Sequence, residues 1–528
     1  MKQTMKHQSL LSGIKSLGIM LSLGLALASC TKDDVAQTPA KPNEEGNKNL
    51  TTFVAGGENK TRTSMDYNSG DFYWEAGDYI YVKDDNNVWQ KSSNAPTSKV
   101  AAFKYKVPGK FTASTSYKVY YLGKNSSGND VTISSTQTQT SPDNTEHFGT
   151  AGDYGSATAN KITGKQQFSF TLEHQPAYLV FQPYTSNTVL HDCYLTKIEV
   201  TSDNDIAETY TINTSTDNLD ASAGGKQIVL TTGGWSSSSN PNGFPLTNSS
   251  ANRTTNGAYM VIKPGTHTLK VRYWVKDITT NVEGTITKQL PSTAYASNTY
   301  YDVTANLNVR DYDGDHYYQW DAQDQYWKGH EWNHSGSQPT LNMYLPGATT
   351  SSDYAKNNSD SRYYNESFPG WGVSNPATHE PCKNLPNANE MTWYATKGDP
   401  RWDGDELWTT MGHLYKGGMW FKKKAYISGF DTTTAYDGTD WQTNDKHQIW
   451  SVSHTLPDAA NSSNYFYLPA LGCYTLGQLS SVGIGGIYWS SSSSPSSSTS
   501  AYMLNFSGGG ITVDSSGRNS GLRIGTFE

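Results

Sequence analysis

The sequence predicts a mainly β protein with two β-sandwich domains followed by an α+β domain. The first observation is period-two alternation: in QFSFTLEH, Phe168, Phe170 and Leu172 alternate with polar residues, as in a half-buried strand. The second is composition, because the chain has 35 Tyr and 15 Trp, and turn residues such as Gly, Asn and Asp separate its short strand-like runs. The third is that the best helix pattern lies late in the chain, beyond residue 380.

Residues 1–30 have the features of a secretory signal. Lys2, Lys6 and Lys15 give a positive start, and the apolar run LGIMLSLGLALA follows at residues 17–28. This run is too short for the roughly 20 residues that cross a bilayer as a helix, and it ends in small residues, as signal peptides do. No later apolar run reaches about 18 residues.

The end of this segment resembles the lipobox of bacterial lipoproteins. The residues concerned are Leu27, Ala28, Ser29 and Cys30. The resemblance implies that Cys30 is acylated, becomes the first residue of the mature chain and ties it to outer-membrane lipid. The next residues, Lys32, Asp33 and Asp34, resemble the signal that sends Bacteroidetes lipoproteins to the outer face of the outer membrane. The alternative is an ordinary signal peptide with a cysteine there by chance.

Charge and cysteine content limit the possible partners. The net charge is −8 and the pI is about 5.8, and the longest basic cluster is the trio at residues 422–424, so we expect no nucleic-acid partner. Beyond Cys30 the chain has Cys193, Cys382 and Cys473, an odd number that leaves at least one thiol free. Cys382 and Cys473 fall in the same region and could pair; the sequence leaves this open.

Residues 31–49 contain no aromatic residue and a single Val, which predicts a flexible tether. Strand-like runs begin at Leu50. Two stretches of similar length and style follow, and they predict one β-sandwich over residues 50–182 and a second over residues 183–309.

Two stretches resemble the fimbrillin family of Bacteroidetes surface proteins. KTRTSMDYNSGDFYWEAGDYIYV, at residues 60–82, resembles the opening of the family's first domain, and FSFTLEHQPAYLVF, at residues 168–181, resembles a later strand pair. The resemblance covers about residues 50–310. It implies paired transthyretin-like sandwiches that polymerise into pili by strand donation, or that anchor or tip such pili, so other pilin subunits are the expected partners.

In that family a protease cuts after a basic residue near the first strand and opens a groove for a partner strand. Lys60 and Arg62, which follow TTFVAGGEN, are the candidates for this processing. A strand-deficient sandwich exposes apolar side chains and unpaired backbone groups, and a donated strand satisfies both. The alternative is that both residues are ordinary solvated loop residues.

Residues 310–335 are dense in aromatic and acidic residues and predict an interdomain linker. Asp311, Asp313 and Asp315 lack the Gly and Glu spacing of a calcium-binding EF-hand loop, so a polar turn is the favoured interpretation. The run from His330 to His334 reads H-E-x-x-H, but a zinc protease needs it on a helix, and glycines flank it here. We therefore predict no catalytic residue, no metal and no cofactor.

Residues 336–528 predict an α+β domain. Asn387 and Glu390 form a capping-box pattern, and Met391, Tyr394 and Ala395 share a helix face. The serine tract at residues 490–500 predicts a mobile loop between two strands.

Residues 380–528 resemble the Fibrobacter-type major paralogous domain. The matching residues are NANE with Trp393 and Tyr394, LPA at 468–470, YWSS at 488–491, and Arg518, Gly521 and Arg523. The resemblance implies a C-type-lectin-like fold at the cell surface with no established catalysis. Trp402 and Trp408 lie in the polar stretch DPRWDGDELW, which predicts an exposed loop whose indoles could contact a ligand.

Together these features predict a surface-exposed, lipid-anchored, fimbrillin-like subunit of the outer membrane at a pilus tip, with an adhesive C-terminal domain. A large domain after the second sandwich would hinder strand donation, which places the subunit at an end of the fibre. Glycans or proteins, of host or bacterial origin, are the expected adhesion ligands. A permanently anchored pilus base protein and a surface-bound hydrolase are the alternatives.

Overall fold

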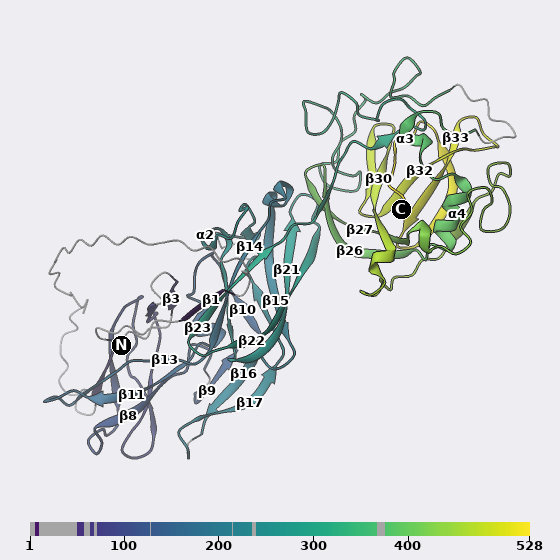
Figure 1. Cartoon of the computed structure of the whole chain (residues 1–528). Helices are drawn as coiled ribbons and strands as arrows, with labels where there is room; N and C mark the ends of the chain where they lie inside the picture. The colour runs from purple at the N-terminus through teal and green to yellow at the C-terminus, as the bar shows by residue number, and fades with distance from the viewer. Residues whose placement is uncertain are drawn as a thin grey trace, which may run out of the picture.

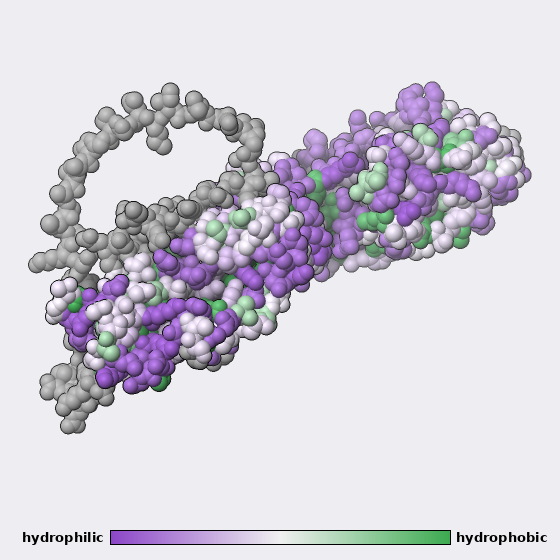
Figure 2. All heavy atoms as spheres, turned by 60° about the horizontal axis from the view of Figure 1, so that its bottom comes forward, coloured by the Kyte–Doolittle hydropathy of each residue, from purple (hydrophilic) through white to green (hydrophobic). Residues whose placement is uncertain are grey.

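The computed structural model describes residues 6–9 (backbone only), 50–56, 64–67, 71–126, 128–213, 215–234, 239–366 and 375–528. These residues form an elongated molecule with three β-rich parts in a row: a first domain, a second domain and a C-terminal domain (Figure 1). Charged and polar residues cover most of the face shown in Figure 2. No helix in the described ranges is long and apolar enough to cross a membrane.

The first domain is one curled sheet. Its main strand order is β6-β5-β8-β11-β12-β2-β7, and β13 pairs with β11. The N–H of Ser93, just after β6, donates to the C=O of Lys106 in β7 (2.7 Å), so the two edges of the sheet meet. The core inside includes Phe53, Trp74 and Tyr105. The strands are β2 (Leu50–Ala55), β5 (Tyr81–Lys83), β6 (Trp89–Lys91), β7 (Phe103–Pro108), β8 (Ser116–Tyr121), β11 (Gly155–Lys161), β12 (Gln167–Phe170) and β13 (Glu173–His174), and β3 (Ser64–Asp66) pairs with β4 (Asp71–Tyr73) beside them.

The second domain is a sandwich of two facing sheets. One has the order β1-β23-β14-β20 and the other β10-β18-β15-β21-β22, with β19 paired to β15. The strands are β1 (Lys6–Ser9), β14 (Ala177–Tyr184), β20 (Ala258–Ile262), β23 (Thr299–Asn306), β10 (Thr136–Thr138), β15 (Cys193–Ser202), β18 (Gln227–Thr231), β19 (Phe244–Pro245), β21 (Gly265–Asp277) and β22 (Glu283–Tyr295). The short helices are α1 (Phe148–Ala151), α2 (Arg253–Asn256) and the 3₁₀ turn η1 (Thr188–Asp192).

The first two domains are interlocked. β9 (Asp130–Ile133) lies in a small sheet with β16 (Ala207–Ile212) and β17 (Leu219–Gly225), and β10 and α1 also belong to the second domain although they come between β8 and β11 in the chain. The predicted boundary at 182–183 falls inside β14. The runs AYLVF and AYMVI in β14 and β20 are buried throughout, because the opposite sheet covers one face of β14 while Phe148 stacks on Tyr178 on the other (ring centroids 4.9 Å apart).

The C-terminal domain contains two main sheets. One has the order β24-β26-β27-β29 and the other β25-β35-β32-β33-β34-β28, and β30 joins β31 to β32. The strands are β24 (Arg310–Tyr312), β26 (Arg401–Thr410), β27 (His413–Lys422), β29 (Tyr465–Pro469), β25 (Tyr317–Tyr318), β35 (Leu522–Arg523), β32 (Gly485–Ser493), β33 (Ser500–Ser507), β34 (Gly510–Gly517), β28 (Gln448–Trp450), β30 (Leu471–Thr475) and β31 (Gln478–Val482). The helical elements are α3 (Glu380–Lys383), α4 (Ala388–Thr396), η2 (Lys424–Tyr426) and η3 (Ser462–Asn464).

Residues 310–335, where the sequence predicts a linker, are built into this domain. They supply β24, β25 and the buried side chains of Trp320, Tyr326 and Trp327. Their contacts come from the far end of the chain: β25 pairs with β35, and the buried guanidinium of Arg518 lies 4.6 Å from the ring of Trp320.

The predicted helix is confirmed. The side chain of Asn387 accepts from the N–H of Glu390 (3.0 Å), and the Glu390 carboxylate accepts from the N–H of Asn387 (3.0 Å), so α4 begins with a complete capping box. Met391, Tyr394 and Ala395 are buried against the sheet.

The prediction of a mobile loop from residue 490 is wrong for the first part of the serine tract. Residues 490–493 end strand β32, and Ser490 and Ser494 are both 0% exposed. The serine hydroxyls in this stretch serve as acceptors for backbone N–H groups of neighbouring segments. The Oγ of Ser492 accepts from the N–H of Ala388 (3.0 Å), and the Oγ of Ser493 accepts from the N–H of Asn375 (2.7 Å). Because serine side chains are small and carry a hydroxyl, the segments around Asn375 and Ala388 can pack closely against this strand. Composition alone does not reveal this role.

The C-terminal domain docks on the second domain through the β26–β27 hairpin. Leu407 and Leu414 belong to the core of the second domain, and the absence of a side chain at Gly284 lets Leu407 approach closely, since a Cβ there would lie 2.6 Å from Cδ2 of Leu407. Oδ2 of the buried Asp277 accepts from the N–H of Leu414 (3.0 Å) and lies 3.6 Å from Nδ1 of His413.

Replacing Asp277 with Ala tests this junction. Burial alone would raise the pKa of Asp277, but hydrogen bonds from His413 and from the N–H groups of Leu414 and Thr279 hold it below its usual value. A lowered carboxyl pKa stabilises the fold above the unfolded pKa, near 4, and this contribution is lost as the pH falls through the folded pKa. We expect Asp277→Ala to lose about 1–3 kcal/mol of unfolding free energy near neutral pH.

Urea unfolding from pH 7 down to pH 3 measures this difference. The difference in unfolding free energy between the unmodified chain and Asp277→Ala should stay constant down to about pH 5 and shrink below about pH 4. Asp405→Ala, which removes an exposed carboxylate 3.6 Å from Lys416, is the control and should leave stability unchanged. A difference that stays constant down to pH 3 would contradict the claim that ionised Asp277 stabilises this junction.

Candidate functional site

The structure offers two kinds of candidate site: strand positions in the first two domains and a pocket in the C-terminal domain. The residues predicted for lipidation, export and processing lie outside the described residues. They are Leu27, Ala28, Ser29, Cys30, Lys32, Asp33, Asp34, Lys60 and Arg62. Their assignments therefore stay predictions, but the strand between them, β2, is described.

β2 is an interior strand of the first domain. It pairs in antiparallel fashion with β7 and in parallel with β12, so both of its backbone edges are used. Phe53 is 0% exposed and its ring stacks on Phe168 and meets Phe111 edge-on, with centroids 5.1 Å apart in both cases. Removal of β2 would leave two strands with unpaired backbone groups beside an aromatic cavity.

The edges of the β1-β23-β14-β20 sheet are satisfied in two different ways. At the β20 edge, the amides of Gln137 and Gln139 replace a neighbouring strand. Gln137 accepts from the N–H of Val261 (2.9 Å) and donates to its C=O (2.7 Å), and Gln139 accepts from the N–H of Tyr259 (2.7 Å) and donates to the C=O of Gly257 (2.9 Å). At the β23 edge, β1 pairs in parallel with residues 299–302 (Figure 1).

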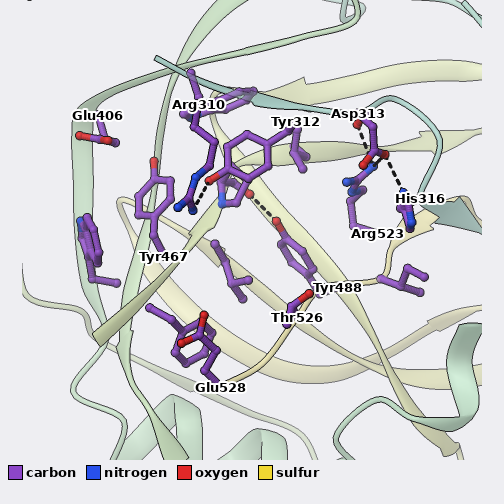
Figure 3. Close-up of a pocket in the computed structure, with 18 of the residues that line it drawn as sticks. Arg310, Tyr312, Asp313, His316, Glu406, Tyr467, Tyr488, Arg523, Thr526 and Glu528 are labelled. Carbon is purple, nitrogen blue, oxygen red and sulfur yellow. Dashed lines mark hydrogen bonds and ion pairs between the residues drawn. The ribbon is translucent and has the colours of Figure 1, made fainter. Parts of the chain in front are cut away.

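The pocket in the C-terminal domain has a volume of about 570 Å³ and lies where β24, β26, β27 and β29 meet β32, β35 and residues 524–528. In Figure 3, Glu406, Tyr467, Arg310 and Tyr312 lie along one side, and Asp313, His316 and Arg523 lie along another. Chain segments more than 200 residues apart build it, because Asp313 and Arg523 both line it and lie 3.4 Å apart.

Aromatic rings form much of the pocket wall. Trp420 and Tyr467 have ring centroids 5.0 Å apart, and the Tyr312 ring meets the buried Trp408 edge-on at 5.9 Å. Trp420, Tyr467 and Tyr312 are half-buried residues that line the pocket, although the hydroxyl oxygen of Tyr467 is itself buried. The hydroxyl of Tyr488 donates to the C=O of Pro469 (2.6 Å), which fixes this ring at the centre of the pocket.

Most of the charged groups at the pocket are paired with each other. Asp313 accepts from Nδ1 of His316 (2.7 Å) and from Arg523 (3.4 Å), and Lys423 lies 2.7 Å from the Glu528 carboxylate. Burial would raise the pKa of Asp313, but these neighbours hold it well below its usual value. Asp313 therefore stays ionised and holds Arg523 in place.

Glu406 and Arg310 differ from these pairs. Glu406 is an exposed residue at the pocket mouth, and its carboxylate has neither a hydrogen-bond nor an ion-pair partner within the described ranges. Partial desolvation in the pocket and the nearby Asp403 raise its pKa, although the attraction to Arg310 opposes this shift. Arg310 donates to the hydroxyl of Tyr312 (3.3 Å), and the residue is exposed. The Arg310 guanidinium and the Glu406 carboxylate attract each other but form no ion pair within the described ranges. One acceptor and one donor group are thus free at the pocket mouth.

The predicted exposed loop at residues 399–408 is wrong, because Trp402 and Trp408 lie in strand β26. Trp408 is 1% exposed, donates to the C=O of Gly417 (3.0 Å) and stacks on Tyr415. Trp402 is half-buried against the domain core. The strand bulges between Asp403 and Leu407, where Asp403 accepts from the N–H of Glu406 (3.0 Å), and this bulge brings Glu406 to the pocket.

Sequence reasoning did not select the pocket residues Arg310, Tyr312, Glu406 and Tyr467. Arg310 and Tyr312 alternate along a short strand, and such alternation is the one available signal in the sequence. It does not reveal that β24 pairs with β26, so the pocket could not be assembled from it.

The other motifs take no part in a metal site. The stretch from His330 to His334 forms turns, so the two imidazoles do not lie one helical turn apart. No group of three or more His, Cys, Asp or Glu in the described ranges is placed to hold a metal ion. Cys193, Cys382 and Cys473 are all buried and free, and burial raises the thiol pKa of each.

Comparison with known proteins gives structural resemblance only. No protein-family model and no curated protein matches the chain. A structure described as a putative cell adhesion protein from Bacteroides ovatus is 12% identical, with 49% of this chain and 93% of that chain covered and a TM-score of 0.29. The fimbrial anchor protein Mfa2 from Porphyromonas gingivalis is 11% identical (46% and 83% covered, TM-score 0.23), as is a fimbrial protein from Bacteroides ovatus (90% and 98% covered, TM-score 0.23).

The double variant Gln137→Leu/Gln139→Leu tests how the β20 edge is closed. It leaves the N–H of Tyr259 and the N–H and C=O of Val261 without their side-chain partners, at a cost of about 1–3 kcal/mol for each buried group. We expect a loss of at least about 2 kcal/mol in unfolding free energy, measured by urea titration. Gln289→Leu, at an exposed position of the same domain, is the matched control. Equal stability of the double variant and the control would show that the amides do not close this edge.

Proposed function

We propose that this chain is a lipid-anchored surface subunit of a pilus, that it accepts a partner's strand in its first domain, and that it occupies an end of the fibre with its C-terminal domain outward. The observation that carries this proposal is the position of β2. The first strand after the predicted tether is an interior strand, and the candidate processing residues Lys60 and Arg62 follow it within a few residues.

A cut after either residue would break the covalent link between β2 and the rest of the domain. Only backbone hydrogen bonds to β7 and β12 and the contacts of inward side chains such as Phe53 would then hold β2. A partner strand with alternating apolar residues could replace β2 and restore both the backbone hydrogen bonds and the side-chain contacts. The same cut would separate the subunit from Cys30 and its lipid.

The arrangement of the domains supports an end position. The C-terminal domain lies at the far end of the molecule from the first domain (Figure 1). Residues 524–528 are held within it: the N–H of Lys424 donates to the C=O of Glu528 (2.6 Å), and the Phe527 ring contacts Tyr394 and Phe466. This segment is therefore not free to act as a donor strand for the next subunit.

The β23 edge supports strand acceptance in a second place. β1 comes from the part of the chain that the lipobox interpretation removes, and its pairing occupies residues 299–302 of β23. In a mature chain that begins at Cys30, β1 would no longer pair with this edge, whereas Gln137 and Gln139 would still close the opposite edge. Partner pilins are therefore the proposed binding partners of the first two domains.

Limited proteolysis with an arginine- and lysine-specific protease tests the proposal. We expect cleavage after Lys60 or Arg62, found by N-terminal sequencing, and we expect the cut chain to stop polymerisation of a partner pilin without forming fibres alone. Lys60→Ala/Arg62→Ala should abolish both effects. Lys165→Ala, in an exposed turn of the same domain, is the matched control and should abolish neither.

Fibres formed by the purified chain alone would contradict the end position. Chains that remain uncut at Lys60 and Arg62 in isolated outer membranes, while still attached to pili, would instead indicate a permanently anchored base protein.

A further inference from the structure

The pocket of the C-terminal domain has the chemistry of a ligand site. Its volume of about 570 Å³ lies within the roughly 300–1,000 Å³ typical of small-molecule sites. It combines partly exposed aromatic rings with a few polar groups at its mouth, and such groups orient a ligand while the rings supply contact area.

The free polar groups define what the ligand must offer. Asp313 and Arg523 neutralise each other, and so do Lys423 and Glu528. The Arg310 guanidinium and the Glu406 carboxylate are left to interact with a ligand. Glu406 when ionised can only accept hydrogen bonds, and Arg310 can only donate them. A group that both donates and accepts, such as a hydroxyl, satisfies both.

The two charges also exclude most ionic ligands. An anionic group would lie near the Glu406 carboxylate and a cationic group near the Arg310 guanidinium, and like charges brought together in a partly desolvated site cost binding energy. A neutral molecule that carries several hydroxyls meets neither penalty.

The aromatic rings favour a ligand with a flat apolar face. Trp420, Tyr467 and Tyr312 present half-buried ring surfaces beside the two charged groups. A pyranose ring has hydroxyls at its rim and a face of C–H groups, so it can stack on an aromatic ring while its hydroxyls bind Glu406 and Arg310.

We propose that this pocket binds a neutral saccharide, with a sugar ring stacked on Trp420 or Tyr467 and its hydroxyls shared between Glu406 and Arg310. This inference rests on the outward position proposed above for the C-terminal domain, and it gives the adhesive role predicted from the sequence a ligand class. The neighbouring charged pairs hold the walls of the pocket in place and do not contact the sugar ring.

A glycan array probed with the full chain tests the ligand class. The array carries neutral oligosaccharides that end in galactose, glucose, mannose or N-acetylglucosamine, together with sialylated and sulfated counterparts. We expect binding to one or more neutral oligosaccharides and weaker or absent binding to the anionic ones. Calorimetry with lactose, mannobiose and N,N′-diacetylchitobiose then gives affinities in solution.

Two variants test whether binding occurs in this pocket: Glu406→Gln, which is nearly isosteric, and Arg310→Gln, which shortens the side chain. Glu406→Gln and Arg310→Gln alter exposed side chains, so the fold should be kept, and each should weaken neutral-glycan binding about tenfold or more. Glu380→Gln, at an exposed position on α3 outside the pocket, is the matched control and should bind as the unmodified chain does.

Three results would overturn the inference: no binding to any neutral oligosaccharide on the array, binding restricted to sialylated or sulfated glycans, or neutral binding that Glu406→Gln and Arg310→Gln both leave unchanged. The fibre-capping assay depends on the first domain and separates this inference from the proposed function. A chain that caps fibres but binds no neutral glycan would retain the end position and lose the saccharide site. A chain that binds glycan but caps nothing would show the reverse.

Discussion

Backbone pairing at strand edges is the constraint on which this structure depends. A buried N–H or C=O group without a partner costs about as much as a lost hydrogen bond, so each edge of a sheet must be paired or covered. The first domain meets this requirement because its sheet closes on itself between Ser93 and Lys106. The β1-β23-β14-β20 sheet of the second domain meets it with the side-chain amides of Gln137 and Gln139 at one edge and with β1 at the other.

Long-range pairing organises the C-terminal domain in the same way. β24 and β25 come from the start of the domain, but they pair with β26 and β35, which follow some 90 to 200 residues later. Arg518 lies over Trp320 and Arg523 over Tyr317, so two buried guanidinium groups fix the start of the domain against its end. The pocket results from this closure, since Asp313 and Arg523 reach it from opposite ends of the domain.

The features that could be predicted from sequence are those fixed by local chemistry. The capping box of Asn387 and Glu390 and the alternation of Phe168 and Phe170 each need only neighbouring residues, and both appear in the structure as expected. The failures have a common cause: Ser490 is buried and Trp408 is part of a strand because of the segments that pack against them. Trp408, a predicted ligand contact, does line the pocket, but the pocket itself was missed for the same reason. The pairing of β24 with β26 places Arg310 opposite Trp408, and no local pattern indicates that pairing.

The connection between the domains bears on how an adhesive end subunit would carry load. β23 leads within three residues to β24, so the strand edge proposed to accept a partner continues into the wall of the pocket. The β26–β27 hairpin makes a second connection, because it places Glu406 and Trp420 at the pocket and Leu414 in the core of the second domain. A pull on a ligand at the pocket would therefore be shared between a continuous chain and a buried junction held by Asp277. The parallel pairing of β24 and β26 lies between these two connections and joins the two segments beside the pocket.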